Sequence, residues 1–344
     1  MLRCLELAEL GKGNVSPNPM VGSVIVSDDN HILGEGFHEQ LGGNHAEINA
    51  INAVNLNNSS INLFTKSTLY VNLEPCSHYG KTPPCADTII KNNFKRVVVG
   101  CKDSSQKVNG KGIEKIKNAG IEVIENIEEK SCTFLNRRFF TFSKKKRPYI
   151  ILKWAVCENG FFAPIPLRQF SITSMLSQKI VHQWRSEEDS ILVGTNTARI
   201  DNPRLNARLV SGKNPTRIVI DRFLNLPQQL HLFDQSQKTI VFNEKTTSLD
   251  NQIHYIQIDF NDYWIQNMLY QLYLLDIQSI IIEGGINILH QFIKEDLWDE
   301  ARVLKGMIKI ETGIKSPEIN GNIIALKTIG DDMLTVFMNQ HYVI

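Results

Sequence analysis

The sequence predicts an α/β protein with two domains, and three observations support this. The chain has 344 residues, enough for two domains of ordinary size, each with its own core. In both halves, short apolar runs typical of strands alternate with amphipathic runs typical of helices. A polar and basic run that ends at Pro148 interrupts this pattern near the middle of the chain. We therefore expect domains over residues 1–143 and 149–344, joined by a linker over residues 144–148.

Charge and cysteine content exclude several classes of protein. The 37 Lys and Arg residues nearly balance the 36 Asp and Glu residues, so we expect no nucleic-acid partner. No run approaches twenty uninterrupted apolar residues, so we expect no membrane segment. The 6 cysteines are too scattered for a disulfide framework and suit a reducing compartment. These features predict a cytoplasmic protein.

The first half should form a β-hairpin followed by a largely parallel sheet with helices. Polar residues 28–30 lie between two apolar runs and predict the hairpin turn. Strands and helices then alternate at the spacing of βαβ units, after a polar loop over residues 55–65. The expected strands cover residues 21–26, 32–37, 68–73, 96–101 and 121–124, and the expected helices cover residues 2–10, 45–54, 86–91, 112–119 and 127–140.

A candidate metal site lies in this half. His45 and Glu47 open an expected helix, Cys76 follows the expected strand 68–73, and Cys85 precedes the next helix. One imidazole and two thiolates leave the fourth position of a tetrahedral Zn²⁺ open, as in catalytic zinc sites. Zinc lowers the pKa of a water molecule, and a nearby carboxylate can carry its proton to a leaving amine. We therefore predict a catalytic zinc with His45, Cys76 and Cys85 as ligands and Glu47 as the proton carrier.

The spacing of the cysteines departs from the general signature of nucleobase deaminases, H-x-E followed by P-C-x-x-C. Eight residues lie between Cys76 and Cys85 instead of two. Pro83 and Pro84 fit a helix start at Cys85, where the helix dipole stabilises a thiolate. Two alternatives stay open: His78 as a fourth ligand, which would make the zinc structural, and cysteines that bind no metal.

Asn18 is a candidate for substrate contact. It lies between two prolines in a rigid polar loop just before the first expected strand. Loops of this kind beside a sheet often carry binding residues. The alternative is an asparagine that only shapes the turn.

The second half should form another α/β layer. The expected strands cover residues 149–156, 190–194, 217–220, 239–242, 255–258 and 279–282, the expected helices cover residues 263–275 and 286–293, and further strands follow residue 300. Residues 195–205 should form a loop rich in hydrogen-bond donors. Lys153 interrupts an apolar strand, so it either faces a ligand or extends to solvent from an edge. Gly284 and Gly285 mark either a phosphate-binding turn or an ordinary tight turn, and without G-x-G-x-x-G a Rossmann domain is not expected.

Several motifs together resemble the RibD family of bifunctional riboflavin-biosynthesis deaminase/reductases, in which the long cysteine spacing is normal. In the first half these are Pro17-Asn18-Pro19-Met20-Val21-Gly22, His45-Ala46-Glu47, Glu74-Pro75-Cys76-Ser77-His78, Lys81-Thr82-Pro83-Pro84-Cys85 and Gly110-Lys111-Gly112-Ile113. In the second half they are Leu152-Lys153, Trp184-Arg185, Ile191-Leu192-Val193-Gly194, Asp201-Asn202-Pro203 and Glu283-Gly284-Gly285. The resemblance implies a cytidine-deaminase-like three-layer domain followed by a dihydrofolate-reductase-like α/β domain that uses NADPH.

The resemblance also implies roles for residues at matching positions. The expected NADPH contacts are Val156, Ser171, Thr197, Asp201, Gly284 and Gly285. The expected contacts of the phosphoribosylated pyrimidine substrate are Asn18, Lys153, Arg185, Leu205, Arg208 and Glu283. Two segments near the cofactor contacts depart from the family's pattern, Cys157-Glu158-Asn159-Gly160 and Ser171-Ile172-Thr173-Ser174.

The sequence thus predicts two successive reactions on one phosphoribosylated pyrimidine, a zinc-dependent deamination and an NADPH-dependent reduction. We expect the loop over residues 77–84 to shape the first pocket, and the resemblance implies a homodimer or a larger oligomer. One alternative is a nucleic-acid base deaminase with an appended binding domain, which the balanced charge disfavours. The other is a non-catalytic nucleotide-binding protein in which zinc only staples the first domain.

Overall fold

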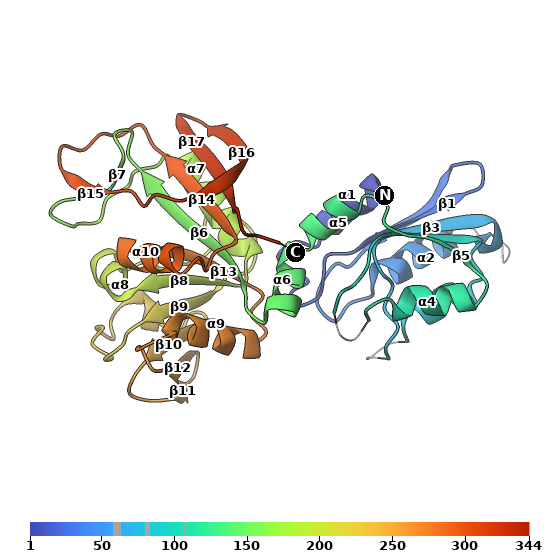
Figure 1. The fold of residues 1–344 in the computed structure, drawn as a ribbon, viewed down its shortest axis with the longest axis horizontal. Helices are drawn as coiled ribbons and strands as arrows, with labels where there is room; N and C mark the ends of the chain where they lie inside the picture. Colours follow the sequence, from blue (N-terminus) through green and yellow to red (C-terminus); the bar gives the residue numbers. More distant parts are fainter. Residues whose placement is uncertain (58–62, 80–82, 106–107, 344) are drawn as a thin grey trace. The chain divides into compact units, whose positions relative to one another are not determined.

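The computed structural model describes residues 1–57, 63–79, 83–105 and 108–343. The chain divides into two compact units, Met1–Lys146 and Arg147–Val343 (Figure 1). Every hydrophobic cluster of the described residues belongs wholly to one unit. Within the described part of the chain, no helix combines the length and apolarity needed to span a membrane.

The first unit is a five-stranded sheet between two layers of helices (Figure 1). The strand order is β2-β1-β3-β4-β5, with β1 antiparallel to β2 and β3, and β3, β4 and β5 parallel. The strands are β1 (Gly22–Ser27), β2 (Ile32–Phe37), β3 (Ser67–Leu73), β4 (Arg96–Cys101) and β5 (Glu122–Ile124), and the short helix η1 (Phe64–Lys66) precedes β3. The helices are α1 (Leu2–Glu9), α2 (Ala46–Asn57), α3 (Cys85–Lys91), α4 (Lys111–Asn118), α5 (Glu129–Leu135) and α6 (Arg137–Lys145).

Alternation along the strands builds this three-layer arrangement. Leu69 and Val71 of β3 pack in the cluster that contains the apolar faces of α2, α3 and α4. On the other face of the sheet, Val24 packs with side chains of α1, while Cys101 packs with side chains of α5 and α6. The expected three-layer fold of the first domain is confirmed.

The second unit is a ten-stranded sheet with helices on both faces. Its order is β11-β12-β10-β9-β8-β13-β6-β14-β17-β16, parallel from β12 to β14 and antiparallel at both edges. The strands are β6 (Tyr149–Val156), β8 (Ser190–Gly194), β9 (Thr216–Ile220), β10 (Thr239–Asn243), β11 (Ser248–Asp250), β12 (Ile253–Gln257), β13 (Ser279–Gly284), β14 (Glu300–Lys305), β16 (Gly321–Ile329) and β17 (Asp332–Asn339), with β7 (Phe161–Pro164) and β15 (Gly313–Lys315) forming a separate pair. The helices are α7 (Met175–Glu187), α8 (Thr195–Asp201), α9 (Trp264–Leu274) and α10 (Ile286–Lys294), with a short helix η2 (His231–Phe233).

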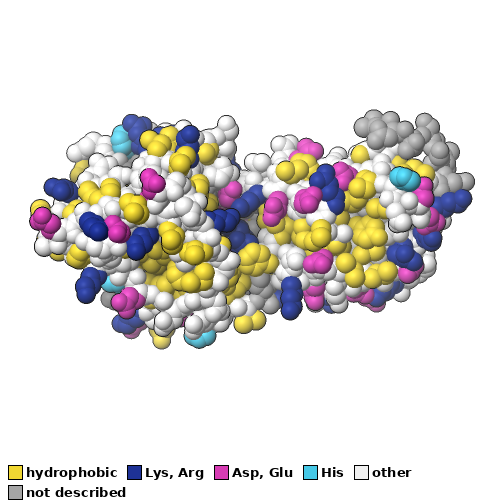
Figure 2. All heavy atoms as spheres, turned by 90° about the horizontal axis from the view of Figure 1, so that it is seen from above, with side chains coloured by type: hydrophobic (Ala, Val, Ile, Leu, Met, Phe, Trp, Pro, Cys, Tyr) yellow, Lys and Arg dark blue, Asp and Glu magenta, His cyan; other side chains and the backbone are white. Residues whose placement is uncertain are grey.

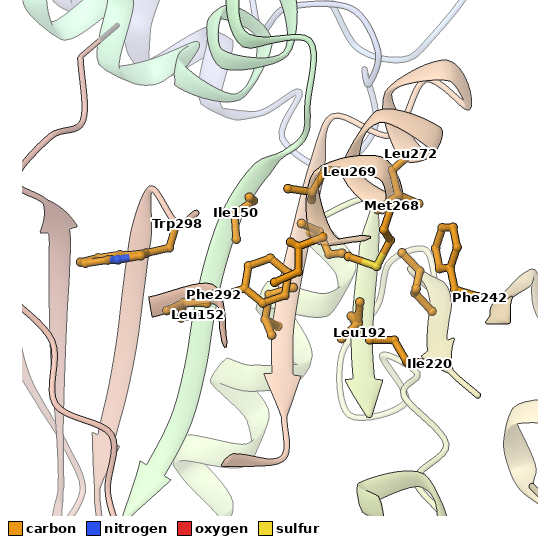
Figure 3. Close-up of a cluster of buried hydrophobic side chains, with 14 of the residues drawn as sticks. Ile150, Leu152, Leu192, Ile220, Phe242, Met268, Leu269, Leu272, Phe292 and Trp298 are labelled. Atoms are coloured by element: carbon orange, nitrogen blue, oxygen red, sulfur yellow. The ribbon is translucent and has the colours of Figure 1, made fainter. Parts of the chain in front are cut away.

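The core of the second unit lies against α9 and α10. In Figure 3, Met268, Leu269 and Leu272 of α9 and Phe292 of α10 pack on side chains of the parallel strands. The opposite face of the sheet packs against side chains of α7 and α8, such as Trp184 and Ala198. The expected α/β layer of the second domain is confirmed.

Four expectations differ from the structure. Helix α6 extends to Lys145, so the first two residues of the expected linker 144–148 are helical. The expected helix 127–140 is two helices that meet at Asn136, where the backbone departs from helical geometry (φ −92°, ψ 21°) and the side-chain amide binds both the N–H and the C=O of Met20. The expected loop 195–205 begins with helix α8. Part of the expected polar loop 55–65 lies outside the described residues, and its first residues continue α2.

Candidate active sites

The expected zinc ligands converge at the ends of three elements. His45 is the residue before α2, Cys76 follows β3 after a Glu-Pro pair, and Cys85 is the first residue of α3. The Nδ1 atom of His45 lies 3.5 Å from the Sγ atom of Cys76 and 3.2 Å from that of Cys85. All three ligand atoms lie within 4.8 Å of one another. Two sulfurs and one imidazole nitrogen form a donor set that zinc favours, so these residues fit the ion.

His78 stands apart from this cluster. Its side chain is exposed, and the metal-type cluster found among the described residues contains only the three ligands above. The geometry therefore favours a site with an open fourth position over a closed one. Residues 80–82 of the expected pocket loop 77–84 lie outside the described part of the chain.

Hydrogen bonds favour a thiolate at Cys76. The Cys85 backbone N–H donates to Cys76 Sγ over 3.2 Å. The Cys85 thiol, and then His45, lower the pKa of Cys76 to about 4 although burial opposes this shift. The same thiol pair, with burial, raises the pKa of Cys85. Because thiolates bind metals, this lowered pKa favours the form of Cys76 that a zinc ion needs.

Glu47 faces the same cluster from the first turn of α2. Its side chain is 3 % exposed and interacts with the Cys85 thiol. Residues i and i+2 of a regular helix point in different directions, but His45 precedes the helix, so both side chains reach the site. Burial, and then the Cys76 charge, raise the pKa of Glu47. A carboxyl group of this kind can hold a proton between two transfers.

Asn18 is held beside the site by His38, a residue that the sequence analysis did not identify. The ring of His38 is buried and lies 5.5 Å from the ring of His45. Its Nδ1 atom is 2.9 Å from the carbonyl oxygen of Asn44, so Nδ1 carries the proton and donates it. Its Nε2 atom must then accept from the Asn18 amide, 3.0 Å away. This chain of bonds fixes the orientation of the Asn18 amide.

Glu74 organises the backbone next to Cys76. Its carboxylate accepts hydrogen bonds from the N–H groups of Gly112 and Ile113 at Oε1 and of Asp103 and Gly110 at Oε2, over distances of 2.9 to 3.3 Å. These bonds connect the end of β3 to the start of α4. The sequence motif contained Glu74, but nothing in it indicated this role.

The second unit contains a cavity of about 1170 Å³ at the carboxyl ends of β6, β8 and β13. This is the edge where ligands bind in open α/β sheets. Five basic and two acidic side chains line it, a net charge of +3 with its histidines neutral: Lys153, Arg168, Arg185, Arg204, Arg208, Asp201 and Glu283. The cavity is therefore suited to a phosphate-bearing ligand.

Most of the residues expected to contact cofactor or substrate in this unit line the cavity: Lys153, Ser171, Arg185, Thr197, Asp201, Leu205, Arg208, Glu283 and Gly285. Two expected cofactor contacts, Val156 and Gly284, are not among the lining residues. Val156 follows Ala155, the last residue of β6 that reaches the cavity, and Gly284 ends β13 one residue before the lining Gly285.

A partly buried ion cluster lies in this cavity. Glu283 accepts from Arg185 at both oxygens, over 2.8 Å at Oε2 and 3.3 Å at Oε1. The Lys153 Nζ lies 4.0 Å from Glu283 Oε1. Burial alone would raise the pKa of Glu283, but Arg185 and then Lys153 outweigh it and hold the pKa at about 2. Burial lowers the pKa of Lys153, against the attraction of Glu283.

The glycine turn after β13 is tied to α8. The Gly285 N–H donates to Thr197 Oγ1 over 2.9 Å. The Gly285 N–H therefore already has a partner within the protein. Of the two alternatives for the glycine pair, this bond is typical of an ordinary tight turn, since a phosphate-binding turn needs free N–H donors. The bond instead holds α8 and the start of α10 together at the cavity wall.

Helix α7 contributes two lining residues that the sequence analysis missed, Gln178 and His182, beside Arg185, which it had identified. Gln178, His182 and Arg185 all line the cavity and lie on one helical face. The signal was available, because His182 lies three residues before an arginine that had been assigned to the substrate.

Comparisons with known proteins match both units. The profile of the "Cytidine and deoxycytidylate deaminase zinc-binding region" matches residues 1–101, and that of the "RibD C-terminal domain" matches residues 148–306. The riboflavin biosynthesis protein RibD of Aquifex aeolicus is 37% identical over 352 aligned residues, covering 98% of this chain and 97% of the relative. The chain belongs to the RibD family. The RibD protein of a Synechocystis strain is 36% identical over 96% of this chain and 87% of its own length.

Solved structures agree with this assignment to the RibD family. A crystal structure of a "diaminohydroxyphosphoribosylaminopyrimidine deaminase/ 5-amino-6-(5-phosphoribosylamino)uracil reductase" from Thermotoga maritima matches with a TM-score of 0.88 and 34% identity, over 98% of this chain and 97% of that one. Acinetobacter baumannii RibD matches with a TM-score of 0.87 and 28% identity, over 98% and 97% of the two chains. The chain therefore contains a zinc-binding deaminase domain followed by a RibD reductase domain, in the same arrangement along the sequence as in these relatives.

Proposed function

We propose that the chain catalyses two successive steps of riboflavin biosynthesis. The first is the hydrolytic deamination of 2,5-diamino-6-(5-phosphoribosylamino)pyrimidin-4(3H)-one. The second is the NADPH-dependent reduction of the ribosyl group of the product to a ribityl chain. The observation that carries the proposal is the presence of two separate sites in one RibD chain, a His-Cys-Cys cluster with a buried Glu and a cationic cavity.

In the first unit, His45, Cys76 and Cys85 would hold zinc. When bound, zinc activates a water molecule for attack on the ring carbon that carries the exocyclic amine. Glu47, buried against Cys85, takes the proton of the water and delivers it to the amine, which leaves as ammonia. Asn18 donates its amide N–H to His38, so its carbonyl oxygen remains to accept from a substrate N–H.

In the second unit, NADPH would supply a hydride to the anomeric carbon of the ribose when bound. The bond from this carbon to the ring oxygen breaks, and the ring oxygen takes a proton and becomes a hydroxyl group. Lys153 is a candidate donor of that proton, since burial lowers its pKa. Arg208, Leu205 and the Arg185–Glu283 pair would hold the phosphoribosyl group.

The cofactor would occupy another part of the same cavity. We place NADPH against Ser171, Thr197, Asp201 and Gly285, which line the cavity. Val156 and Gly284 do not line the cavity, but each adjoins a residue that does, and we place them at the edge of the cofactor site. The positive charge of the cavity supports this placement, since NADPH and the substrate both carry phosphate groups.

The decisive experiment uses Glu47→Gln, which keeps the shape of the side chain and removes its proton transfer. We expect ammonia release from the diaminopyrimidine ribotide to fall by at least about 100-fold, the usual contribution of general acid–base catalysis. NADPH oxidation with the deaminated intermediate, 5-amino-6-(5-phosphoribosylamino)uracil, should be unchanged. Glu283→Gln is the matched variant in the second unit. It should lower NADPH oxidation and leave ammonia release unchanged. Loss of both activities in either variant would contradict the assignment of one reaction to each site.

The assembly and the cellular location are also part of the proposal. We propose a homodimer or larger oligomer, supported by the exposed apolar side chains of Ile323, Ile324 and Leu326 on β16, an edge strand of the sheet. Light scattering after size-exclusion chromatography tests this. We place the enzyme in the cytoplasm, in keeping with its free cysteines. Basic and acidic side chains are interspersed on the face seen in Figure 2, as the net charge of +1 leads one to expect, which suits a small-molecule substrate.

A further inference from the structure

His182 is a buried polar residue in the cavity of the second unit without an assigned role. It lies in the middle of α7, its side chain is 4 % exposed, and it lines the cavity. Its Nδ1 atom is buried and has no hydrogen-bond partner among the described residues. Native proteins seldom leave a buried ring nitrogen unpaired, because the lost hydration is not replaced. A ligand in the cavity is the natural source of the missing partner.

The surroundings of His182 keep its ring neutral. Burial, followed by the charges of Arg185 and Arg208, lowers the pKa of His182 to about 4. A neutral imidazole can both donate and accept a hydrogen bond, so it suits a hydroxyl or phosphate oxygen beside the arginines. It does not add a further charge to a cavity that is already cationic.

The position of His182 indicates which ligand it meets. The charged side chains that act on its ring are Arg185, Arg208, Glu283 and Lys153. All four belong to the group placed at the phosphoribosylated substrate. His182 therefore lies on the substrate side of the cavity.

Helix α7 places His182 between Arg185, which is placed at the substrate, and Gln178, which binds the Ser171 hydroxyl placed at the cofactor. Arg185 follows His182 by three residues and Gln178 precedes it by four, so all three lie on one helical face. The Arg185 guanidinium binds Glu283 and the carbonyl oxygen of Asn206, and the Gln178 amide binds Ser171 and the carbonyl oxygen of Thr173. Of these three side chains in the described structure, the His182 ring is the one with a buried nitrogen left for a ligand.

We propose that His182 is a substrate-binding residue of the reduction step, and that its Nδ1 atom makes a hydrogen bond to the phosphoribosyl part of the substrate. This inference rests on the proposed function of the second unit. Helix α7 would then contribute to substrate specificity in two ways. Arg185 supplies a positive charge for the phosphate, and His182 supplies a hydrogen bond to a polar atom of the sugar phosphate.

The test uses three substitutions in the full-length protein. His182→Phe keeps a ring but removes both nitrogens, His182→Asn keeps a polar atom near the position of Nδ1, and His182→Gln keeps one near Nε2. His290→Phe, at an exposed histidine of α10, is the control. Each variant is assayed for NADPH oxidation with 5-amino-6-(5-phosphoribosylamino)uracil and for ammonia release by the first unit.

For His182→Phe we expect the KM for the ribotide to rise about tenfold, the value of one neutral hydrogen bond. The KM for NADPH, the kcat and the ammonia release should stay within about twofold of the wild type, as should all values for His290→Phe. His182→Asn should recover most of the affinity, and His182→Gln should recover little. Wild-type tryptophan emission, which comes from the second unit alone, shows that this unit is folded in each variant, and unchanged ammonia release shows that the first unit is unaffected.

Three outcomes would overturn the role of His182: an unchanged KM for the ribotide in His182→Phe, a rise confined to the KM for NADPH, or an Asn variant no better than Phe. The last outcome would identify the ring as packing alone. A wild-type protein that does not oxidise NADPH with the ribotide would instead refute the proposed function itself. The two failures are therefore distinguishable.

Discussion

Glu74 shows how one side chain can hold a metal ligand in place without touching the metal. Its two oxygens accept four backbone N–H groups, and it lies two residues before Cys76. The segments it joins are closely packed, since a Cβ atom on Gly112 would lie 2.0 Å from the carbonyl oxygen of Pro75. The carboxylate therefore fixes the path of the chain that carries the first thiolate.

We predict that Glu74→Gln weakens zinc binding in the first unit. The glutamine amide group would face two N–H donors in place of an acceptor, and a hydrogen bond to a charged group is worth about 1.5–3 kcal/mol. Zinc affinity should fall about 10- to 100-fold, as it does when groups that support metal ligands are lost. The measurement is a competition titration with a zinc chelator, together with ammonia release.

Glu114→Gln is the control for this substitution, because Glu114 is an exposed acid on the same helix as Gly112. It should bind zinc like the wild type. If Glu74→Gln also bound zinc normally, the carboxylate would have no part in positioning Cys76. NADPH oxidation should be unaffected in both variants.

At the scale of elements, the close packing of α2 on β2 places the first site. Gly36 of β2 lies against the first turns of α2, and a Cβ atom there would be 2.3 Å from the Ala50 nitrogen and 2.6 Å from the Ala46 carbonyl oxygen. Since His45 and Glu47 lie at the start of this helix, any displacement of α2 moves a zinc ligand and the proton carrier together.

We predict that Gly36→Ala destabilises the first unit even though alanine is usually favoured over glycine in a strand. Backbone atoms must shift to make room, and overpacking of this kind typically costs about 1–3 kcal/mol. The temperature of half-inactivation of ammonia release should fall by several degrees, at about 2–4 °C per kcal/mol. That of NADPH oxidation should not change.

Gly120→Ala is the comparison for Gly36→Ala, because a Cβ atom there meets open space and only its positive φ of 83° causes strain. Its loss of stability should be smaller. An equal loss in both variants would mean that the contact with α2 is unimportant.

Sequence patterns predicted well the strands and helices whose bounds depend on their own residues and not on distant parts of the chain. Strands β6 and β8 have the expected bounds because each is a mainly apolar run with polar residues on either side. Helix α7 was missed because its start depends on a distant residue: the Asp332 carboxylate accepts the N–H and hydroxyl of Ser174 and the hydroxyl of Ser177. Helix α8 contains poor helix formers and is held by bonds from Thr195 to Ile220 and from Gly285 to Thr197.

The same distinction applies to the sites. The zinc ligands were predictable because zinc chemistry demands certain residue types in a certain order. The contributions of His38 and Glu74 were not, because each acts on residues brought near by the fold: His38 on Asn18, and Glu74 on the start of α4. The role of His182 depends on an empty hydrogen-bonding position, which only a structure can reveal.

At the scale of the whole molecule, the two units have separate hydrophobic cores, and a different measurement follows each unit. The chain has 4 tryptophans, at positions 154, 184, 264 and 298, and all of them belong to the second unit. Tryptophan emission therefore follows the second unit alone. Ammonia release reports on the first unit, so each can be observed while the other is perturbed.

We predict that removing zinc disables the first unit and spares the second. The ligands connect the start of α2, the segment after β3 and the start of α3, so the ion joins three parts of one unit. A ligand present at 1,000 times its Kd stabilises the folded state by about 4 kcal/mol, and this contribution disappears on chelation. Dialysis against a chelator should abolish ammonia release and lower the melting temperature of the first unit. Tryptophan emission and NADPH oxidation with the deaminated intermediate should be retained, and added zinc should restore ammonia release. Parallel loss of NADPH oxidation on chelation would show that the second site depends on the metal, and the two-site arrangement would then be wrong.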